Sequence, residues 1–202
     1  MNLRLFLTAA LAAWLLAGCG AARPSKYYQL TVPRDSAAVT PSNPFPITLL
    51  LSPLRTSHLY REDHIVYSSA GESMGTYLYD RWAESPSEML VDVLLRDLLN
   101  SGRYRSVEML HSNSRGDYTL HGRLYDFEEV SGPPLMARVT VDLELRENKS
   151  DTTVWTHYYS HDEPVSEKNV SAVVAALDRN AQRGMKEVEA SLAQYFSTHP
   201  LS

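Results

Sequence analysis

The side chains that could carry chemistry in this chain are few and scattered. It holds seven histidines in 202 residues, and only His157 and His161 lie close together, followed by Asp162 and Glu163. On a helix, this four-residue spacing would place both imidazoles on one face, where they could bind zinc. The run Trp155–Tyr159 is instead typical of a strand, where the two histidines would lie about 13 Å apart, too far for one ion. We therefore expect no metal site and no cofactor.

The sequence also lacks the local patterns of common enzymes and nucleic-acid binders. It has neither a G-x-S-x-G elbow nor a phosphate-binding G-x-x-x-x-G-K-[ST] loop. A Ser-His-Asp hydrolase stays open only because composition does not exclude it. The net charge is −5 with no strongly basic stretch, which disfavours nucleic-acid binding. We expect a protein that is not an enzyme and does not bind nucleic acid.

The single cysteine, Cys19, is the clearest candidate for chemistry. It follows the apolar run Leu5–Ala17, which is shorter than the ~20 residues a membrane-spanning helix needs and fits the core of a secretory signal. The ending Leu16-Ala17-Gly18-Cys19 resembles the lipobox of bacterial lipoproteins. That resemblance implies that the thiol receives a diacylglyceryl group and that cleavage frees the cysteine amine for another acyl chain. We expect a signal peptide over 1–18, a lipidated tether over 19–25 and a folded domain over 26–202.

The residue after the cysteine bears on localisation. In lipoproteins of this kind an aspartate there tends to retain the protein at the inner membrane, and this chain has Gly20. The resemblance therefore implies an anchor in the outer membrane, with the domain facing the periplasm. Stable anchoring needs two or more acyl chains.

Three neighbouring residues have the types that anchor protein interfaces. Tyr79, Arg81 and Trp82 combine large contact area with polar groups, so we consider them candidates for binding a partner. The alternative is that Trp82 packs against the helix that follows it. Trp155 and Tyr158 are better explained by packing within the sheet than by a site.

The strongest structural signal is a helix over 86–101. Ser85 and Glu88 form a capping-box pattern around Pro86 at the first helical position, and Gly102 follows as a stop signal. A second, longer helix is expected over Asn169–Ser197, in which Gly184 marks a kink or a close approach.

Strand patterns fill the rest of the domain. The best is 135–146, where apolar and polar residues alternate as in an antiparallel strand with one buried face. With its neighbours it predicts an antiparallel meander. The fold class is α/β, an α+β sandwich: one domain with a mixed, largely antiparallel sheet and two main helices packed on it. The other expected strands are Lys26–Val32, Ile47–Leu51, Ile65–Ser69, Thr76–Asp80 (after a turn around Gly71 and Gly75), Tyr104–Leu110, Asp117–Val130 and Thr152–Ser160.

Several segments together resemble the ABC-type transport auxiliary lipoprotein family, which includes the paraquat-inducible protein C lipoproteins. The resemblance covers about residues 16–197 and is strongest over 59–102. It is carried, after the lipobox, by Tyr27-Tyr28-Gln29-Leu30, by 47–53, by 59–67, by the run from Tyr77 to Pro86 with Met89-Leu90, and by Leu99-Asn100-Ser101-Gly102.

The resemblance implies a partner of lipid transport systems rather than an enzyme. Such systems combine an ABC permease with a periplasmic protein of mammalian-cell-entry (MCE) domains, and the lipoprotein is expected to dock that protein at the outer membrane. A homo-oligomer that encircles the partner is compatible with this role. Two alternatives stay open: a periplasmic module that holds a lipid in a closed apolar cavity, and an outer-membrane biogenesis lipoprotein that accompanies a β-barrel.

Overall fold

The computed structural model describes residues 23–34, 45–69 and 73–199. The expected signal peptide, Cys19 and Gly71 therefore lie outside the described residues, and Arg23 to Ser25 are exposed residues outside any helix or strand. The elements in chain order are β1 (Lys26–Tyr28), β2 (Phe45–Leu51), β3 (Arg55–Thr56), the 3-10 turn η1 (His58–Tyr60), β4 (His64–Ser69), β5 (Ser73–Trp82), α2 (Pro86–Ser101), β6 (Tyr104–Met109), β7 (Tyr118–Ser131), β8 (Met136–Glu147), β9 (Thr152–Pro164) and α3 (Val170–Thr198).

The long strand β7 organises the nine-stranded sheet. One edge of β7 pairs with β8, and β8 pairs with β9, both antiparallel. The other edge is shared by β2, β3 and β4, which pair with β7 one after another in parallel. Outside them, β6 pairs with β2, β5 pairs with β4, and β1 pairs with β5. The mixed sheet in one domain is as expected, and the β7–β8–β9 meander supplies its longest antiparallel pairings.

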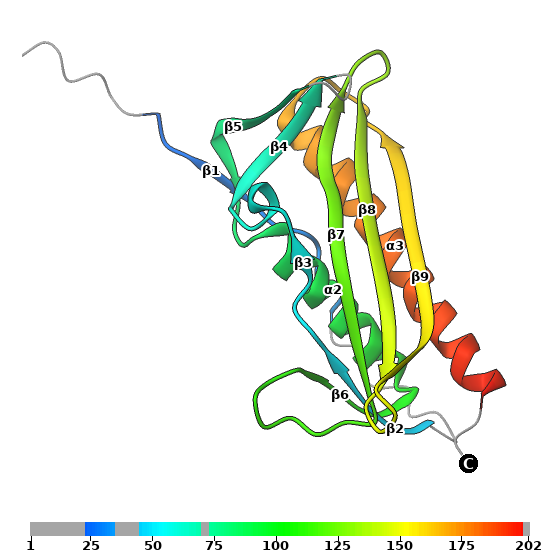
Figure 1. Cartoon of the computed structure of the whole chain (residues 1–202). Helices are drawn as coiled ribbons and strands as arrows, with labels where there is room; N and C mark the ends of the chain where they lie inside the picture. Colours follow the sequence, from blue (N-terminus) through cyan, green and yellow to red (C-terminus); the bar gives the residue numbers. More distant parts are fainter. Residues whose placement is uncertain (1–22, 35–44, 70–72, 200–202) are drawn as a thin grey trace, which may run out of the picture.

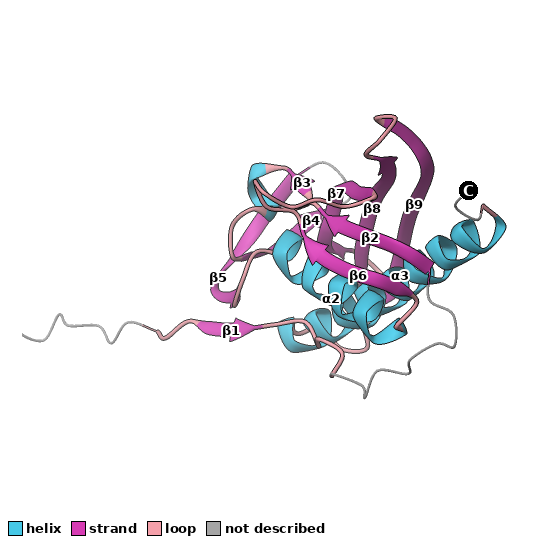
Figure 2. Cartoon of the chain, turned by 90° about the horizontal axis from the view of Figure 1, so that it is seen from below, coloured by secondary structure: helices cyan, strands magenta, loops and turns pink. Residues whose placement is uncertain are grey.

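Both helices pack on the same face of the sheet (Figures 1 and 2). The alternation expected over 135–146 is confirmed: Ala137, Val139, Val141, Leu143 and Leu145 are buried. The side chains that α3 turns toward the sheet are also buried, with Val173, Leu177 and Val188 fully inside. Within the described part of the chain, no helix combines the length and apolar character needed to cross a membrane.

Helix α2 begins and ends where the sequence places it. The Ser85 hydroxyl accepts from the Glu88 amide at 3.4 Å, and the Glu88 carboxylate accepts from the Ser85 amide at 3.1 Å. Gly102 has a φ of 60°, in the left-handed region that glycine adopts without strain. Local capping chemistry thus fixes both ends of the helix.

Removing the cap should weaken the domain measurably. Ser85→Ala is expected to lower the free energy of unfolding by about 1 kcal/mol, because it leaves first-turn amides without a partner. Urea denaturation followed by circular dichroism measures the loss. Ser25→Ala, at an exposed residue outside the sheet, is the control and should change little; equal stability of both variants would contradict the capping role.

Two strand boundaries differ from expectation. The strand expected over 26–32 ends at Tyr28, because the next residues bond to α3 instead of to another strand: the amide and hydroxyl of Thr31 donate to Asp178 at 2.9 and 2.7 Å. Gly75 lies inside β5 and not in a turn. It stands opposite Tyr67, whose ring would lie 2.5 Å from a side-chain Cβ at that position.

The close approach expected at Gly184 is confirmed. A Cβ there would lie 2.7 Å from the ring of Tyr159. The ring is held in place because its hydroxyl donates to the buried Asn180 side chain at 2.6 Å, and burial raises the pKa of Tyr159 to about 12. Because Gly184 has no side chain, α3 can pack closely against β9 at this position.

Gly184→Ala should consequently destabilise the domain despite the better helix propensity of alanine. We expect the free energy of unfolding to fall by about 1 kcal/mol. Overpacking against a fixed ring costs more than the roughly 1 kcal/mol that alanine gains in helix propensity. The urea midpoint measures it. A raised midpoint would mean that the ring of Tyr159 can move aside.

Candidate functional surface

A large irregularity in β5 creates a projecting corner at one end of the sheet. The two-residue step from His64 to Val66 on β4 lies opposite the five-residue step from Thr76 to Arg81 on β5. The extra residues cannot all pair, so they bulge outward. Leu78 and Tyr79 lie in this bulge, with 67% and 36% of their surface exposed.

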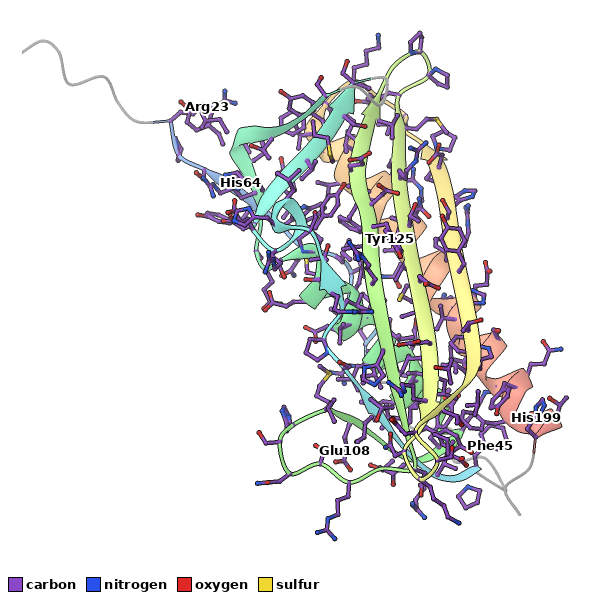
Figure 3. All side chains as sticks on the ribbon, in the orientation of Figure 1. Arg23, Phe45, His64, Glu108, Tyr125 and His199 are labelled. Carbon is purple, nitrogen blue, oxygen red and sulfur yellow. The ribbon has the colours of Figure 1, made fainter. Side chains whose placement is uncertain are left out.

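The start of the domain lies beside the same bulge. Strand β1 pairs in parallel with the end of β5, with Tyr27 opposite Arg81. Tyr27 is 64% exposed, and the Arg23 guanidinium lies 5.2 Å from the centre of the Tyr79 ring. We call the residues Arg23, Tyr27, Leu78, Tyr79 and Arg81 the β5 corner. It lies apart from the β7–β9 meander, on the side where β1 enters (Figure 1), and Figure 3 labels Arg23 there.

The three interface candidates have different surroundings. Tyr79 is accessible, as described. Arg81 is half-buried and forms an ion pair with Asp63 at 2.8 Å. Trp82 is fully buried and packs edge-on against Phe127, with 5.4 Å between the ring centres. A side chain inside the core cannot touch a partner, so Trp82 instead fixes the end of β5 that carries the other two.

The other aromatic residues and histidines considered in the sequence also differ in burial and in the residues that they contact. Trp155 is partly buried against the core, and its indole donates to Ser191 of α3 at 3.2 Å. Tyr158 is 64% exposed, so the expectation that it packs within the sheet is wrong. His157 faces Glu187 at 3.2 Å, and His161 faces Glu163 at 3.6 Å and Arg183. Within the described ranges, no three His, Cys, Asp or Glu side chains gather as metal ligands.

Among the described residues, buried apolar side chains occupy the layer between the sheet and the helices. The apolar cavity there, bounded by residues such as Leu51, Leu90, Leu120 and Met185, encloses only about 10 Å³. A module that holds a lipid inside this layer would need a cavity of a few hundred Å³. This observation argues against a lipid-holding core.

Larger hollows lie open at the surface. One of about 410 Å³ lies between residues 29–32 and the start of α2. Another of about 540 Å³ lies between Tyr77 of β5, the β7–β8 hairpin and the start of α3, and the buried Glu129 carboxylate lines it. Sequence reasoning missed the second hollow. The available signal was the pair of successive glutamates, Glu128 and Glu129, within a long strand. Successive strand residues point to opposite faces, so one of the two must face the helix layer.

Comparisons with known proteins agree with this architecture. Residues 28–189 match the family described as "ABC-type transport auxiliary lipoprotein component". No curated protein matches the chain. The fold is similar to that of protein XCC0632 from Xanthomonas campestris (19% identity, TM-score 0.74, covering 86% of this chain and 98% of that one). It is also similar to an uncharacterized protein (12% identity, TM-score 0.65, covering 84% and 99%).

At these identities the solved structures show the fold alone, whereas the family match spans most of the chain. The family description names a transport component and not an enzyme. The sequence resemblance and the matched range lead to the same result. The chain belongs to the family of ABC-type transport auxiliary lipoprotein components.

Proposed function

We propose that this protein is a lipid-anchored auxiliary subunit of an ABC transport system that moves lipids between the two bacterial membranes. Acyl chains on Cys19 hold it in the outer membrane, on the periplasmic face, and its domain docks the periplasmic MCE-domain protein. The family match over residues 28–189 supports the role as a transport component. The observation that carries the docking role is the β5 corner, an exposed aromatic and basic surface beside the point where the tether enters the fold.

The short tether limits where the domain can be. Six residues lie between Cys19 and Lys26, the first residue of β1. The seven Cα-to-Cα steps from one to the other span at most about 25 Å in an extended chain. The β5 corner would therefore stay close to the membrane surface. Holding a binding surface there raises its effective concentration toward a partner that reaches the membrane, so a weak contact is sufficient.

The composition of the β5 corner suits protein contact. Tyr27 and Tyr79 offer rigid aromatic area, Leu78 offers apolar area, and Arg23 adds a charge at the rim. Tyrosine and arginine are the residue types enriched at energetically important interface positions. Arg81 is held by Asp63 and keeps the end of β5 in place.

Co-purification of the acylated protein with the MCE-domain protein tests the docking role. The double variant Leu78→Ser/Tyr79→Ser should bind at least about tenfold more weakly, because two interface anchors are lost. Tyr158→Ser is the control: Tyr158 is an exposed tyrosine like Tyr79, with 64% of its surface exposed, but it lies on β9. Unchanged binding by the double variant would exclude the β5 corner, and co-purification with a β-barrel instead would favour the biogenesis alternative.

The same preparation tests self-association. We propose that several copies surround a tube-shaped partner, which gives each copy the same contact. Mass determination by light scattering should then give a multiple of the protomer mass. A monomer at micromolar concentration would exclude the ring.

A further inference from the structure

Two neighbouring glutamates on β7 are both buried, and each is held by two hydroxyl groups. Glu128 is 4% exposed and Glu129 6% exposed. Glu128 accepts from the hydroxyls of Tyr60 at 2.8 Å and Ser68 at 3.0 Å. Glu129 accepts from those of Tyr77 at 2.5 Å and Ser131 at 2.8 Å. The two sites have the same chemistry on successive residues.

Their surroundings nevertheless differ. Glu128 stands opposite Arg138 in the β7–β8 register. The pKa of that guanidinium is raised mainly by its hydrogen bonds to Asp162, and the charge of Glu128 adds to the rise. Glu128 also lies under the 3-10 turn that carries Tyr60. Glu129 instead lines the open pocket of about 540 Å³. Only one of the two carboxylates is thus both within the protein and reachable by a ligand.

The hydrogen bonds of the Glu129 carboxylate in this pocket do not use all of its acceptor positions. An ionised carboxylate can accept about four hydrogen bonds, and the two hydroxyls that donate to Glu129 carry no positive charge. A buried charge is costly unless it is paired. The rest of the lining is mixed: Pro133, Leu135 and Val170 are apolar, and Ser131, Lys168 and Asn169 are polar or charged. The Tyr77 side chain adds an aromatic ring, a group that attracts cations.

We propose that this pocket binds an alkylammonium group. The ammonium donates to the free positions of the Glu129 carboxylate, and the alkyl stem lies against Leu135 and Val170. Lys168 is exposed at the lining, so a ligand with a second positive charge near the mouth is disfavoured. The group could belong to a free amine or to a lysine side chain of a protein. The inference does not depend on the docking role proposed above.

Titration of the ¹⁵N-labelled full mature chain tests the site. The chain carries Cys19→Ala so that it can be studied without detergent. The probe is n-butylammonium, and n-butanol is the uncharged control. We expect saturable shifts of the Gly132, Leu135 and Val170 amide signals with n-butylammonium only. Equal shifts with n-butanol, or shifts that do not saturate, would overturn the proposal.

Substitution of each of the two glutamates distinguishes a loss of ligand binding from a general loss of protein stability. Glu129→Gln should raise the half-saturating concentration about tenfold or more, since a charged hydrogen bond is lost. Glu128→Gln removes the same kind of buried charge at the preceding residue. It should leave the half-saturating concentration within about twofold of the wild-type value. If both variants bind equally well, Glu129 is not the receptor for the cation. Val170→Phe, which fills the pocket and keeps the carboxylate, should also abolish the shifts and serves where Glu129→Gln fails to fold.

A second ligand distinguishes the source of the ammonium. Acetyl-glycyl-lysyl-glycine amide carries a lysine side chain within a short peptide. Tighter binding of the peptide than of n-butylammonium indicates a lysine of a protein partner, and equal binding indicates a free amine. Both results support the proposal that the pocket binds an alkylammonium group, whereas absence of binding by both ligands overturns it.

Discussion

Replacing Cys19 with alanine should release the protein from membranes and leave its fold unchanged. The reason is that, in the proposed function, attachment depends on acyl chains on Cys19, and each buried methylene of such a chain contributes about 0.8 kcal/mol. The described residues contain no helix that could cross a membrane, and the sequence is acidic overall, with a net charge of −5. We expect the wild-type protein in the membrane fraction and Cys19→Ala almost wholly in the soluble periplasmic fraction.

The measurement is immunoblotting of separated fractions, with the thermal midpoint of each purified protein as the test of folding. Gly20→Asp is the matched control, because it keeps the cysteine and should move the protein toward the inner membrane without releasing it. Membrane retention of Cys19→Ala, or an unmodified thiol in mass spectra of the native protein, would contradict lipid anchoring. A soluble variant that still restores transport would show that the anchor is not needed for function.

Trp82→Ala should cause the largest loss of stability among the substitutions considered. Trp82 is fully buried and contacts Phe127 of the central strand β7. Truncating a buried tryptophan removes its transfer free energy and leaves a cavity, so we expect the free energy of unfolding to fall by about 3–5 kcal/mol. The loss should also disorder the β5 corner, because Trp82 holds the strand end that carries Tyr79 and Arg81.

Urea denaturation gives the stability change, and Trp82→Phe separates the effects. Phenylalanine retains an aromatic ring and should cost clearly less than alanine. Tyr158→Ala, at a 64% exposed position, should stay within about 0.5 kcal/mol of the wild type. A loss below about 1 kcal/mol for Trp82→Ala would mean that the neighbouring side chains collapse into the space.

Elements with strong local signals were predictable from the sequence. Helix α2 has the expected bounds because its capping box and terminal glycine act within a few residues. Strand β8 matches its alternation because successive side chains point to opposite faces whatever the partner strand is. The family resemblance rested on an ordered set of such short segments and is confirmed by the match over residues 28–189.

The glutamate pair shows what the sequence alone left undetermined. Glu128 and Glu129 look alike in the chain, yet one lies opposite Arg138 and the other lines an open pocket. The cover over Glu128 comes from η1, and the hollow beside Glu129 is bounded by the start of α3. Segments so distant in the chain become neighbours only after the sheet has formed.

The amino-acid sequence by itself determined the class of fold, the capped helix, the alternating strand and the cysteine expected to carry lipid, because each depends on spacing within a few residues. Tertiary structure decided that β7 takes three parallel partners on one edge, that β5 bulges to expose Leu78 and Tyr79, and that Trp82 lies in the core. Strand register and burial depend on long-range packing, in which each residue's surroundings are supplied by segments far away in the chain.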